Sequence, residues 1–267
     1  MTINFLRYPG GKSKVIQKLM PFIEGAANGC SKYCEPFVGG GSVAVAVAKA
    51  MPNAELWLND ADPDIFAVCK VLTSKRKTDS LICTLEKWKP SVRLFRKLKN
   101  ESPRSIVDRA ARLIALNRMA FSGKWGTGPI GGWKQTGKWK IGVEWRLEHV
   151  ISNIRHASEV LRNHKTTVTN LDFSKVIQPG WAIYLDPPYY QRGNSMYPIS
   201  MTSAEHENLA NIIRNQSNWV ISYDDCPEIR CLYGDCDIRT LEWKYSAGIG
   251  KNVTGKELII MPSKRVE

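Results

Sequence analysis

The chain has 267 residues, is 43% hydrophobic and carries a formal net charge of +13, so it can bury one good hydrophobic core and a second, smaller one. No apolar run is long enough to span a bilayer, and the seven cysteines form no CxxC pair and lie apart from the four histidines, which disfavours a zinc site. We therefore expect a cytosolic protein with reduced cysteines and no bound metal.

The predicted elements before residue 70 are two short strands with a helix between them. Apolar, β-rich segments predict strands over 32–37 and 55–60. The alanine- and valine-rich stretch over 42–50 predicts a helix that ends before Pro52. A strand, a helix and a second strand in this order are typical of a parallel sheet with right-handed crossovers.

The next block, residues 71–165, contains the whole excess of positive charge. It holds 21 Lys+Arg and 7 Asp+Glu, a net charge of +14, whereas the rest of the chain has a net charge of −1. Helices are predicted over about 104–121 and 145–163, with a glycine-rich loop between them. A basic block of this kind usually faces a polyanion, although solvated helix faces would also explain it. We expect a mostly helical insertion that binds nucleic acid.

After the block, strands and helices alternate again. A helix is predicted over 203–214 with Thr202 as its N-cap. The predicted strands cover residues 166–171, 181–185, 219–222, 238–245 and 257–261. The last two are suited to an antiparallel pair. The chain is therefore expected to form an α/β catalytic domain from residues 1–70 and 166–267, which residues 71–165 interrupt.

Two loops at the ends of the first strands predict a binding site for a nucleoside-containing cofactor. The segment EPFVGGGSV (35–43) joins a strand to a helix, and its Gly39 and Gly41 let the backbone turn tightly and approach a ligand closely. The next strand ends in LNDAD (58–62), which places the carboxylate of Asp60 where ribose hydroxyls can bind. The spacing of the glycines is not the G-x-G-x-x-G of dinucleotide-binding loops, so a tight turn that binds no ligand is the alternative.

The segment RYPGGKSK (7–14) ends like a phosphate-binding loop. It lacks the first glycine of that motif, because Leu6 occupies the position. Lys12 is therefore expected to neutralise a carboxylate or a phosphate beside the sheet.

The segment AIYLDPPYYQ (182–191) places an acid, two prolines and two tyrosines at the end of a predicted strand. Neither proline can donate a ladder hydrogen bond, and each disfavours a helix immediately before it. A strand end with a proline stop accounts for Pro188 but leaves the carboxylate and the tyrosines unexplained.

In this order, the segments RYPGGK, EPFVGGGS, LND, LDF and DPPY resemble the Dam-type DNA adenine methyltransferases, over roughly residues 1–70 and 166–261. The resemblance implies a Rossmann-like S-adenosylmethionine-dependent methyltransferase sheet with an inserted DNA-recognition domain, and double-stranded DNA as the substrate. We expect a monomer. The residues that match cofactor-binding positions of the family are Tyr8, Lys12, Phe37, Asp60, Asp172, Phe173 and Asp186.

The DPPY residues suggest how such an enzyme activates an aromatic amine. The lone pair of the amine is delocalised into the purine ring, and two acceptors that hold its hydrogens would free it. Asp186 supplies one acceptor and the Pro187 carbonyl the other, aimed by a backbone that Pro187 and Pro188 restrict. Tyr189 offers a face on which an extruded base can stack. We predict methyl transfer from S-adenosylmethionine to the amino group of a flipped adenine in DNA.

Alternative functions are compatible with some of these residues. Methylation of the cytosine amine uses the same pair of acceptors. A catalytically inactive DNA-binding protein would keep the basic block, but it would have no use for an intact DPPY segment. Methylation of a protein glutamine amide would not need the basic insertion. Methylation of a cytosine carbon needs a cysteine after a proline, whereas here Cys226 precedes Pro227.

DNA contacts are expected from the N-terminal segment and from the insertion. The candidate DNA-binding residues are Arg7, Arg118, Lys124, Lys134 and Lys138. Arg118 can instead lie at the edge of the core. The tryptophans between the lysines can stack on bases or build a small satellite core; they are Trp125, Trp133 and Trp139. Because few side chains there suit paired base-edge contacts, we expect recognition that is looser than, or different from, GATC.

Overall fold

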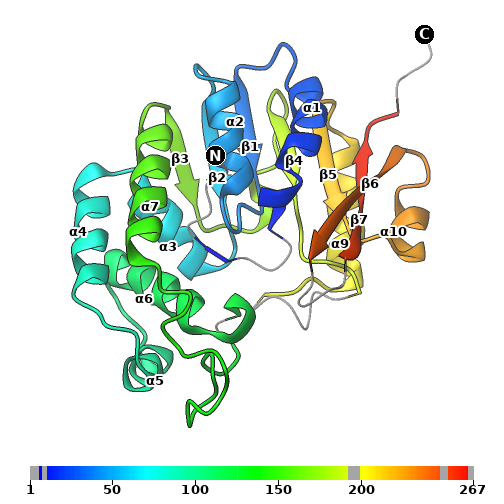
Figure 1. Ribbon diagram of the computed structural model, residues 1–267. Coiled ribbons are helices and arrows are strands. Elements are labelled where there is room, and N and C mark those ends of the chain that lie inside the picture. The colour runs from blue at the N-terminus through cyan, green and yellow to red at the C-terminus, as the bar shows by residue number, and fades with distance from the viewer. Residues whose placement is uncertain (1–5, 8–10, 125, 192–198, 247–251, 264–267) are drawn as a thin grey trace.

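The computed structural model describes residues 6–7, 11–124, 126–191, 199–246 and 252–263. Its centre is a seven-stranded sheet in the order β3-β2-β1-β4-β5-β7-β6 (Figure 1). The strands are β1 (Lys32–Glu35), β2 (Glu55–Asn59), β3 (Thr166–Thr169), β4 (Ala182–Leu185), β5 (Trp219–Tyr223), β6 (Asp237–Ser246) and β7 (Asn252–Met261).

The sheet is parallel from β1 to β5, and β7 lies antiparallel between β5 and β6. These pairings confirm the mainly parallel sheet and the antiparallel final pair. The strand order reverses between β1 and β4, which are neighbours in the sheet although far apart in the sequence. Crossovers leave such a switch point in opposite directions, so a crevice opens at the carboxyl ends of these strands.

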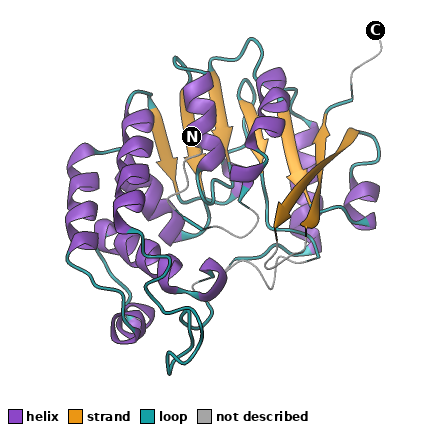
Figure 2. Cartoon of the chain, viewed as in Figure 1, coloured by secondary structure: helices purple, strands orange, loops and turns teal. Residues whose placement is uncertain are grey.

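Helices cover the sheet and extend from one side of it (Figure 2). The α-helices are α1 (Ile16–Ala26), α2 (Ser42–Ala50), α3 (Pro63–Leu72), α4 (Lys75–Glu86), α5 (Val92–Asn100), α6 (Ile106–Met119), α7 (Leu147–Arg162), α9 (Ser203–Arg214) and α10 (Pro227–Leu232). Short 3-10 turns are η1 (Lys12–Lys14), η2 (Phe121–Gly123) and η3 (Phe173–Lys175). The predicted helix over 203–214 is confirmed, and Thr202 caps it in a reciprocal box with Glu205.

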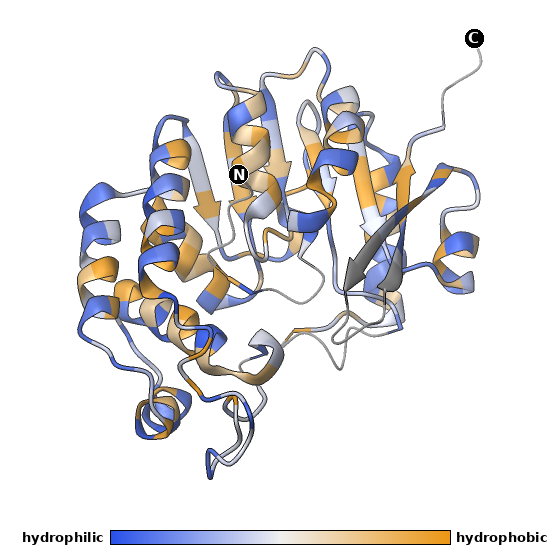
Figure 3. Cartoon of the chain, in the orientation of Figure 1, coloured by the Kyte–Doolittle hydropathy of each residue, from blue (hydrophilic) through white to orange (hydrophobic). Residues whose placement is uncertain are grey.

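Two hydrophobic clusters lie on opposite faces of the sheet. Alternate residues of a strand point to opposite faces, and accordingly Tyr33 belongs to one cluster and Cys34 to the other. Helices α1, α2 and α7 pack on the first face, and α9 and α10 on the second. The central strands β4 and β5 are buried at every position, as expected for parallel strands that are covered on both faces, and Figure 3 shows hydrophobic residues in them.

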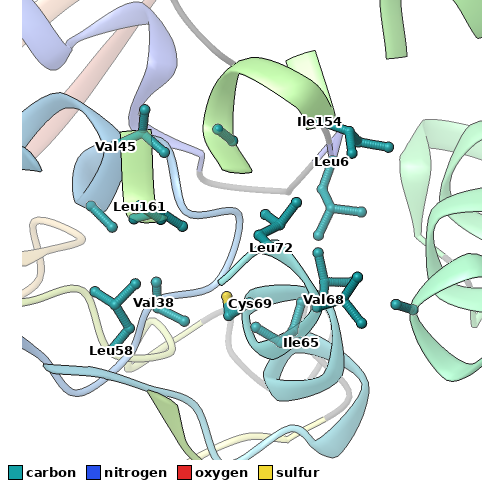
Figure 4. Close-up of a cluster of buried hydrophobic side chains, with 14 of the residues drawn as sticks. Leu6, Val38, Val45, Leu58, Ile65, Val68, Cys69, Leu72, Ile154 and Leu161 are labelled. Atoms are coloured by element: carbon teal, nitrogen blue, oxygen red, sulfur yellow. The ribbon is translucent and has the colours of Figure 1, made fainter. Parts of the chain in front are cut away.

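The first cluster continues from the sheet into the basic block. Leu58 of β2 and Leu72 of α3 lie in the same cluster as Ile154 and Leu161 of α7 (Figure 4). The cluster also includes residues of α4, α5 and α6. Helices α4 to α7 thus share a continuous core with the sheet, and Figure 1 shows α5 and the loop after α6 extending beyond the carboxyl ends of the strands. In the described part of the chain, no helix is long and apolar enough to cross a membrane.

Candidate active site

An open cleft of about 950 Å³ lies at the carboxyl ends of β1, β2 and β4. Every predicted cofactor residue that the structure describes lines this cleft, namely Lys12, Phe37, Gly39, Gly41, Asp60, Asp172, Phe173 and Asp186. Tyr8 lies outside the described residues. Of the predicted catalytic residues, Pro188 lines the cleft together with Asp186.

The glycine loop after β1 is shaped by left-handed backbone and by one carboxylate. Gly39 and Gly41 have φ values of 46° and 68°, which side chains with a Cβ rarely adopt. The Gly39 N–H donates to Oδ2 of Asp60 (2.8 Å), and the Asp62 N–H donates to Oδ1 (2.9 Å). Burial raises the pKa of Asp60 to about 7, although these two amides oppose the shift. Asp60 therefore holds the loop in place while it lines the cleft.

Asn59, the residue before Asp60, ties three segments together beneath the cleft. It is fully buried. Its amide nitrogen donates to the carbonyls of Pro36 and Leu171, both at 3.0 Å. Its amide oxygen accepts from the Leu171 N–H and the Thr169 hydroxyl. The ends of β1, β2 and β3 are thereby fixed relative to one another.

Two phenyl rings lie together in the cleft wall. The ring centroids of Phe37 and Phe173 are 5.6 Å apart, with the ring planes inclined at 34°. Asp172 caps η3, because its Oδ1 accepts from the Ser174 N–H at 2.9 Å. The rings offer an apolar surface for a flat heterocycle, and Asp172 sets the start of the turn that carries Phe173.

The Asp186 carboxylate is held through one of its two oxygens. Oδ1 accepts from Lys12 Nζ at 2.5 Å and from the Ser222 hydroxyl at 3.1 Å. The Ser222 hydroxyl also pairs with the Tyr184 hydroxyl at 2.8 Å, so Tyr184 donates to Ser222 and Ser222 donates to Asp186. Among the described residues, none donates to Oδ2 of Asp186 or to the Pro187 carbonyl. Of this predicted pair, Asp186 lines the cleft, whereas Pro187 is buried and is not among the residues that line it.

Lys12 is buried between two carboxylates. Its ammonium lies 2.5 Å from Asp186 Oδ1 and 2.8 Å from Glu257 Oε1, and the Lys12 side chain is only 3% exposed. Burial alone would lower the pKa of Lys12, but Asp186 and Glu257 raise it well above its ordinary value. The expectation that Lys12 neutralises a carboxylate beside the sheet is confirmed.

The tyrosines after the prolines are fixed by further carboxylates. The Tyr189 hydroxyl donates to Glu257 Oε1 at 3.1 Å, and the Lys12 ammonium lies over the Tyr189 ring, 5.5 Å from its centroid. The Tyr190 N–H donates to Asp224 at 3.0 Å. The segment therefore has a fixed path beside the cleft.

Sequence reasoning missed several residues of this site. Glu257 directly precedes the apolar residues 258–260 of β7, Ser222 follows the apolar start of β5, and both are buried. A charged residue at a position where the strand pattern predicts burial was the available signal for Glu257. Glu35 is also buried in the cleft wall, and burial and the nearby Asp186 raise its pKa well above the ordinary value. In the described residues, no group of three or more His, Cys, Asp and Glu side chains could hold a metal ion.

The candidate DNA-binding residues lie outside the cleft. Asn117 accepts from the Arg7 N–H at 2.7 Å and donates to the Arg7 carbonyl at 2.9 Å, so it ties the N-terminal segment to α6. Arg118 is only 6% exposed, and burial and the nearby Arg7 lower its pKa to about 10. Its burial favours the position at the edge of the core over a phosphate contact. Lys134 and Lys138 are exposed.

The aromatic residues of the same loop differ in their surroundings. Trp133 lies edge-on to Phe95 of α5, with ring centroids 5.8 Å apart, and Arg96 lies over its ring. These contacts fit the satellite core. Both side chains nevertheless remain exposed, Trp133 to 47% and Trp139 to 61%, and Trp125 lies outside the described residues. Lys124 is half-buried, at the start of the loop.

Comparison with known proteins gives a consistent result. A family model described as D12 class N6 adenine-specific DNA methyltransferase matches residues 8–247. The chain is 24% identical over 209 residues to the type II methyltransferase M.MjaIII of Methanocaldococcus jannaschii, covering 69% of this chain and 68% of that protein. It is 22% identical over 268 residues to the type II methyltransferase M.CviBI of Paramecium bursaria Chlorella virus NC1A, covering 96% of this chain and 97% of that protein.

Proposed function

Because the chain belongs to the D12 class of N6 adenine-specific DNA methyltransferases, we propose that its cleft holds S-adenosylmethionine beside an adenine extruded from duplex DNA. The family makes the chain an enzyme that methylates adenine in DNA, which sets aside the cytosine-amine and inactive alternatives. The observation that carries the proposal is the Asp186 carboxylate, fixed through Oδ1 with Oδ2 open beside the cleft. DNA as the substrate places the enzyme in the cytoplasm or nucleoid of its cell.

The residues of the cleft fit this cofactor. Bound there, it would supply an electrophilic methyl group on a sulfonium. Asp60 can accept from the ribose hydroxyls, and the backbone at Gly39 and Gly41 permits close approach. Phe37 and Phe173 offer an apolar surface to the adenine of the cofactor.

Asp186 and Pro187 would activate the target amine. The Lys12 and Ser222 contacts fix one carboxylate oxygen and leave Oδ2 to accept an amine hydrogen. The Pro187 carbonyl would accept the second hydrogen. Holding both hydrogens draws the nitrogen lone pair out of the ring, and the fixed acceptors need no reorganisation during the reaction.

Tyr189 and the basic block, residues 71–165, would contact the DNA. A paired adenine hides its amine within the stack, so the base has to leave the duplex. The Tyr189 ring, held through its hydroxyl by Glu257, is a candidate platform for that base. We propose residues 71–165 as the DNA-recognition part of a monomeric enzyme, with exposed lysines such as Lys134 and Lys138 at phosphates.

Nucleoside analysis of DNA from cells that express the protein tests this function. The wild type should produce N6-methyladenine, and Asp186→Ala should abolish it while leaving the fold and much of the DNA affinity intact. Asp235→Asn, which changes a carboxylate paired with Arg214 on the surface, is the matched control and should methylate like the wild type. Normal methylation by Asp186→Ala would remove Asp186 from the mechanism.

A further inference from the structure

Glu257 is a buried carboxylate that the predicted mechanism does not use. It lies on β7, which pairs with β5, and its side chain is only 2% exposed. Isolated carboxylates are almost never buried unless they are paired. The partners of Glu257 are the Lys12 ammonium at 2.8 Å and the Tyr189 hydroxyl at 3.1 Å. Both partners belong to the segments that surround Asp186.

The ammonium of Lys12 therefore faces two carboxylates at once. Asp186 and Glu257 both contact it within 2.8 Å, and the three side chains together carry a net charge of −1. In a buried site the attraction between charges is weakly screened. A cation that serves a single carboxylate draws electron density from it, whereas a cation shared by two carboxylates neutralises each of them less.

We propose that Glu257 is a positioning residue that acts through Lys12. By holding the ammonium on the side away from the target base, it keeps Asp186 fixed but incompletely neutralised, and so a strong acceptor for the adenine amine. Hydrogen bonds to an ionised acceptor are about twice as strong as neutral ones. The inference rests on the proposed role of Asp186. It gives a function to Glu257, the second buried carboxylate that contacts Lys12.

Glu257→Gln removes the negative charge of the side chain and keeps its shape, so it tests whether that charge affects the rate. The glutamine carbonyl can still accept from the Tyr189 hydroxyl and from Lys12, but Asp186 becomes the single carboxylate in ion-pair contact with the ammonium. The rate of a single turnover at saturating S-adenosylmethionine and duplex DNA should fall by about tenfold or more. The dissociation constants for both should stay within about threefold, because Glu257 does not line the cleft.

Two further variants show whether Lys12 carries the effect. In a Lys12→Met background, Glu257→Gln should cause no further loss of rate, because there is no ammonium left to share. Where Glu257→Gln alone does not fold, the comparison of Lys12→Met with Lys12→Met/Glu257→Gln still tests the inference, since the double variant removes both members of the buried pair.

The possible outcomes separate this inference from the proposed function. A Glu257→Gln rate within twofold of wild type, or an equal loss in the Lys12→Met background, would each overturn the role of Glu257. In those cases the function stands as long as Asp186→Asn is inactive. If Asp186→Asn keeps its activity, the proposed function itself fails.

Discussion

At the scale of single residues, the site depends on which atoms of each carboxylate are already engaged. Asp186 uses Oδ1 for Lys12 and Ser222, which leaves Oδ2 for a substrate. Asp60 uses both oxygens for backbone N–H groups of the loop that it supports. A carboxylate oxygen can accept more than one hydrogen bond, so this bracing is compatible with a ribose contact.

Cofactor affinity should depend on pH through Asp60. Burial raises its pKa to about 7, so below that pH the carboxyl is protonated and accepts more weakly from ribose hydroxyls. Affinity for S-adenosylmethionine should therefore rise as the pH increases through about 7 and level off above it. Asp60→Asn should remove this dependence and weaken binding by roughly 1.5–3 kcal/mol.

Calorimetry of the wild type and of Asp60→Asn between about pH 6 and pH 8 checks this. The difference between the two proteins isolates Asp60, because the amino group of the cofactor titrates equally in both. Parallel pH profiles would show that Asp60 does not contact the cofactor.

Sequence predicted the residues that stand in short motifs and missed those that topology brings in. Asp60, Lys12 and Asp186 occur in segments with unusual local composition, and the cleft collects all three. Glu257 directly precedes the apolar residues 258–260 of β7, and its contact with Lys12 joins residues from opposite ends of the chain. Such a contact follows from strand order, which no local pattern encodes.

At the scale of elements, the ends of the strands decide the shape of the cleft. Strands predicted to reach residues 37 and 60 end at Glu35 and Asn59, because the chain leaves the sheet there to line the cleft. After Glu35 the composition remains apolar through Phe37 and Val38, so periodicity alone extends that strand. Helices α3, α4 and α5 were not predicted, although Asp62, Ser74 and Ser91 cap their first turns.

Asn59→Ala should loosen the strand ends and the cleft together. The substitution removes the four hydrogen bonds that the buried Asn59 side chain makes with Pro36, Thr169 and Leu171. We expect the free energy of unfolding to fall by about 3 kcal/mol, with weaker cofactor binding. Urea denaturation measures the first effect and calorimetry the second. Asn211→Ala, an exposed residue of α9, is the control. A loss below about 0.5 kcal/mol would show that Asn59 does not brace the fold.

At the scale of the whole molecule, the excess positive charge is confined to one part of the chain. The net charge of +14 in residues 71–165 lies in the part that we propose for DNA, and the catalytic part is nearly neutral. The division of charge was readable from the sequence. The shared core was not, because the helices of the basic block pack against α2 and α3 through residues whose partners are distant in the chain.

Lys134→Gln/Lys138→Gln should weaken DNA binding without changing the sequence preference. Each phosphate contact contributes about 0.9 to the slope of log affinity against log salt, so the double variant should lower that slope by up to about 2. Lys32→Gln/Lys49→Gln is the matched control, because these exposed lysines lie outside residues 71–165, at the amino end of β1 and in the last turn of α2. Equal slopes for all three proteins would remove Lys134 and Lys138 from the DNA contact.

Methylation should extend over several sequence contexts. The loop after α6 exposes lysines and Trp139, whereas paired recognition of a base edge usually uses arginine or asparagine. Lysine contacts to phosphates position the DNA but carry no sequence information. A map of N6-methyladenine in DNA from an expressing host checks the point, and marks confined to GATC would refute it.

The most direct test of the account is the rate of a single turnover by Asp186→Asn. The substitution keeps the size of the side chain and removes its charge, so it weakens the acceptor without opening a cavity. At saturating S-adenosylmethionine and duplex DNA, the rate should fall by about a hundredfold or more, with the fold and much of the DNA affinity intact. A rate within threefold of wild type would contradict the claim that Asp186 activates the adenine amine.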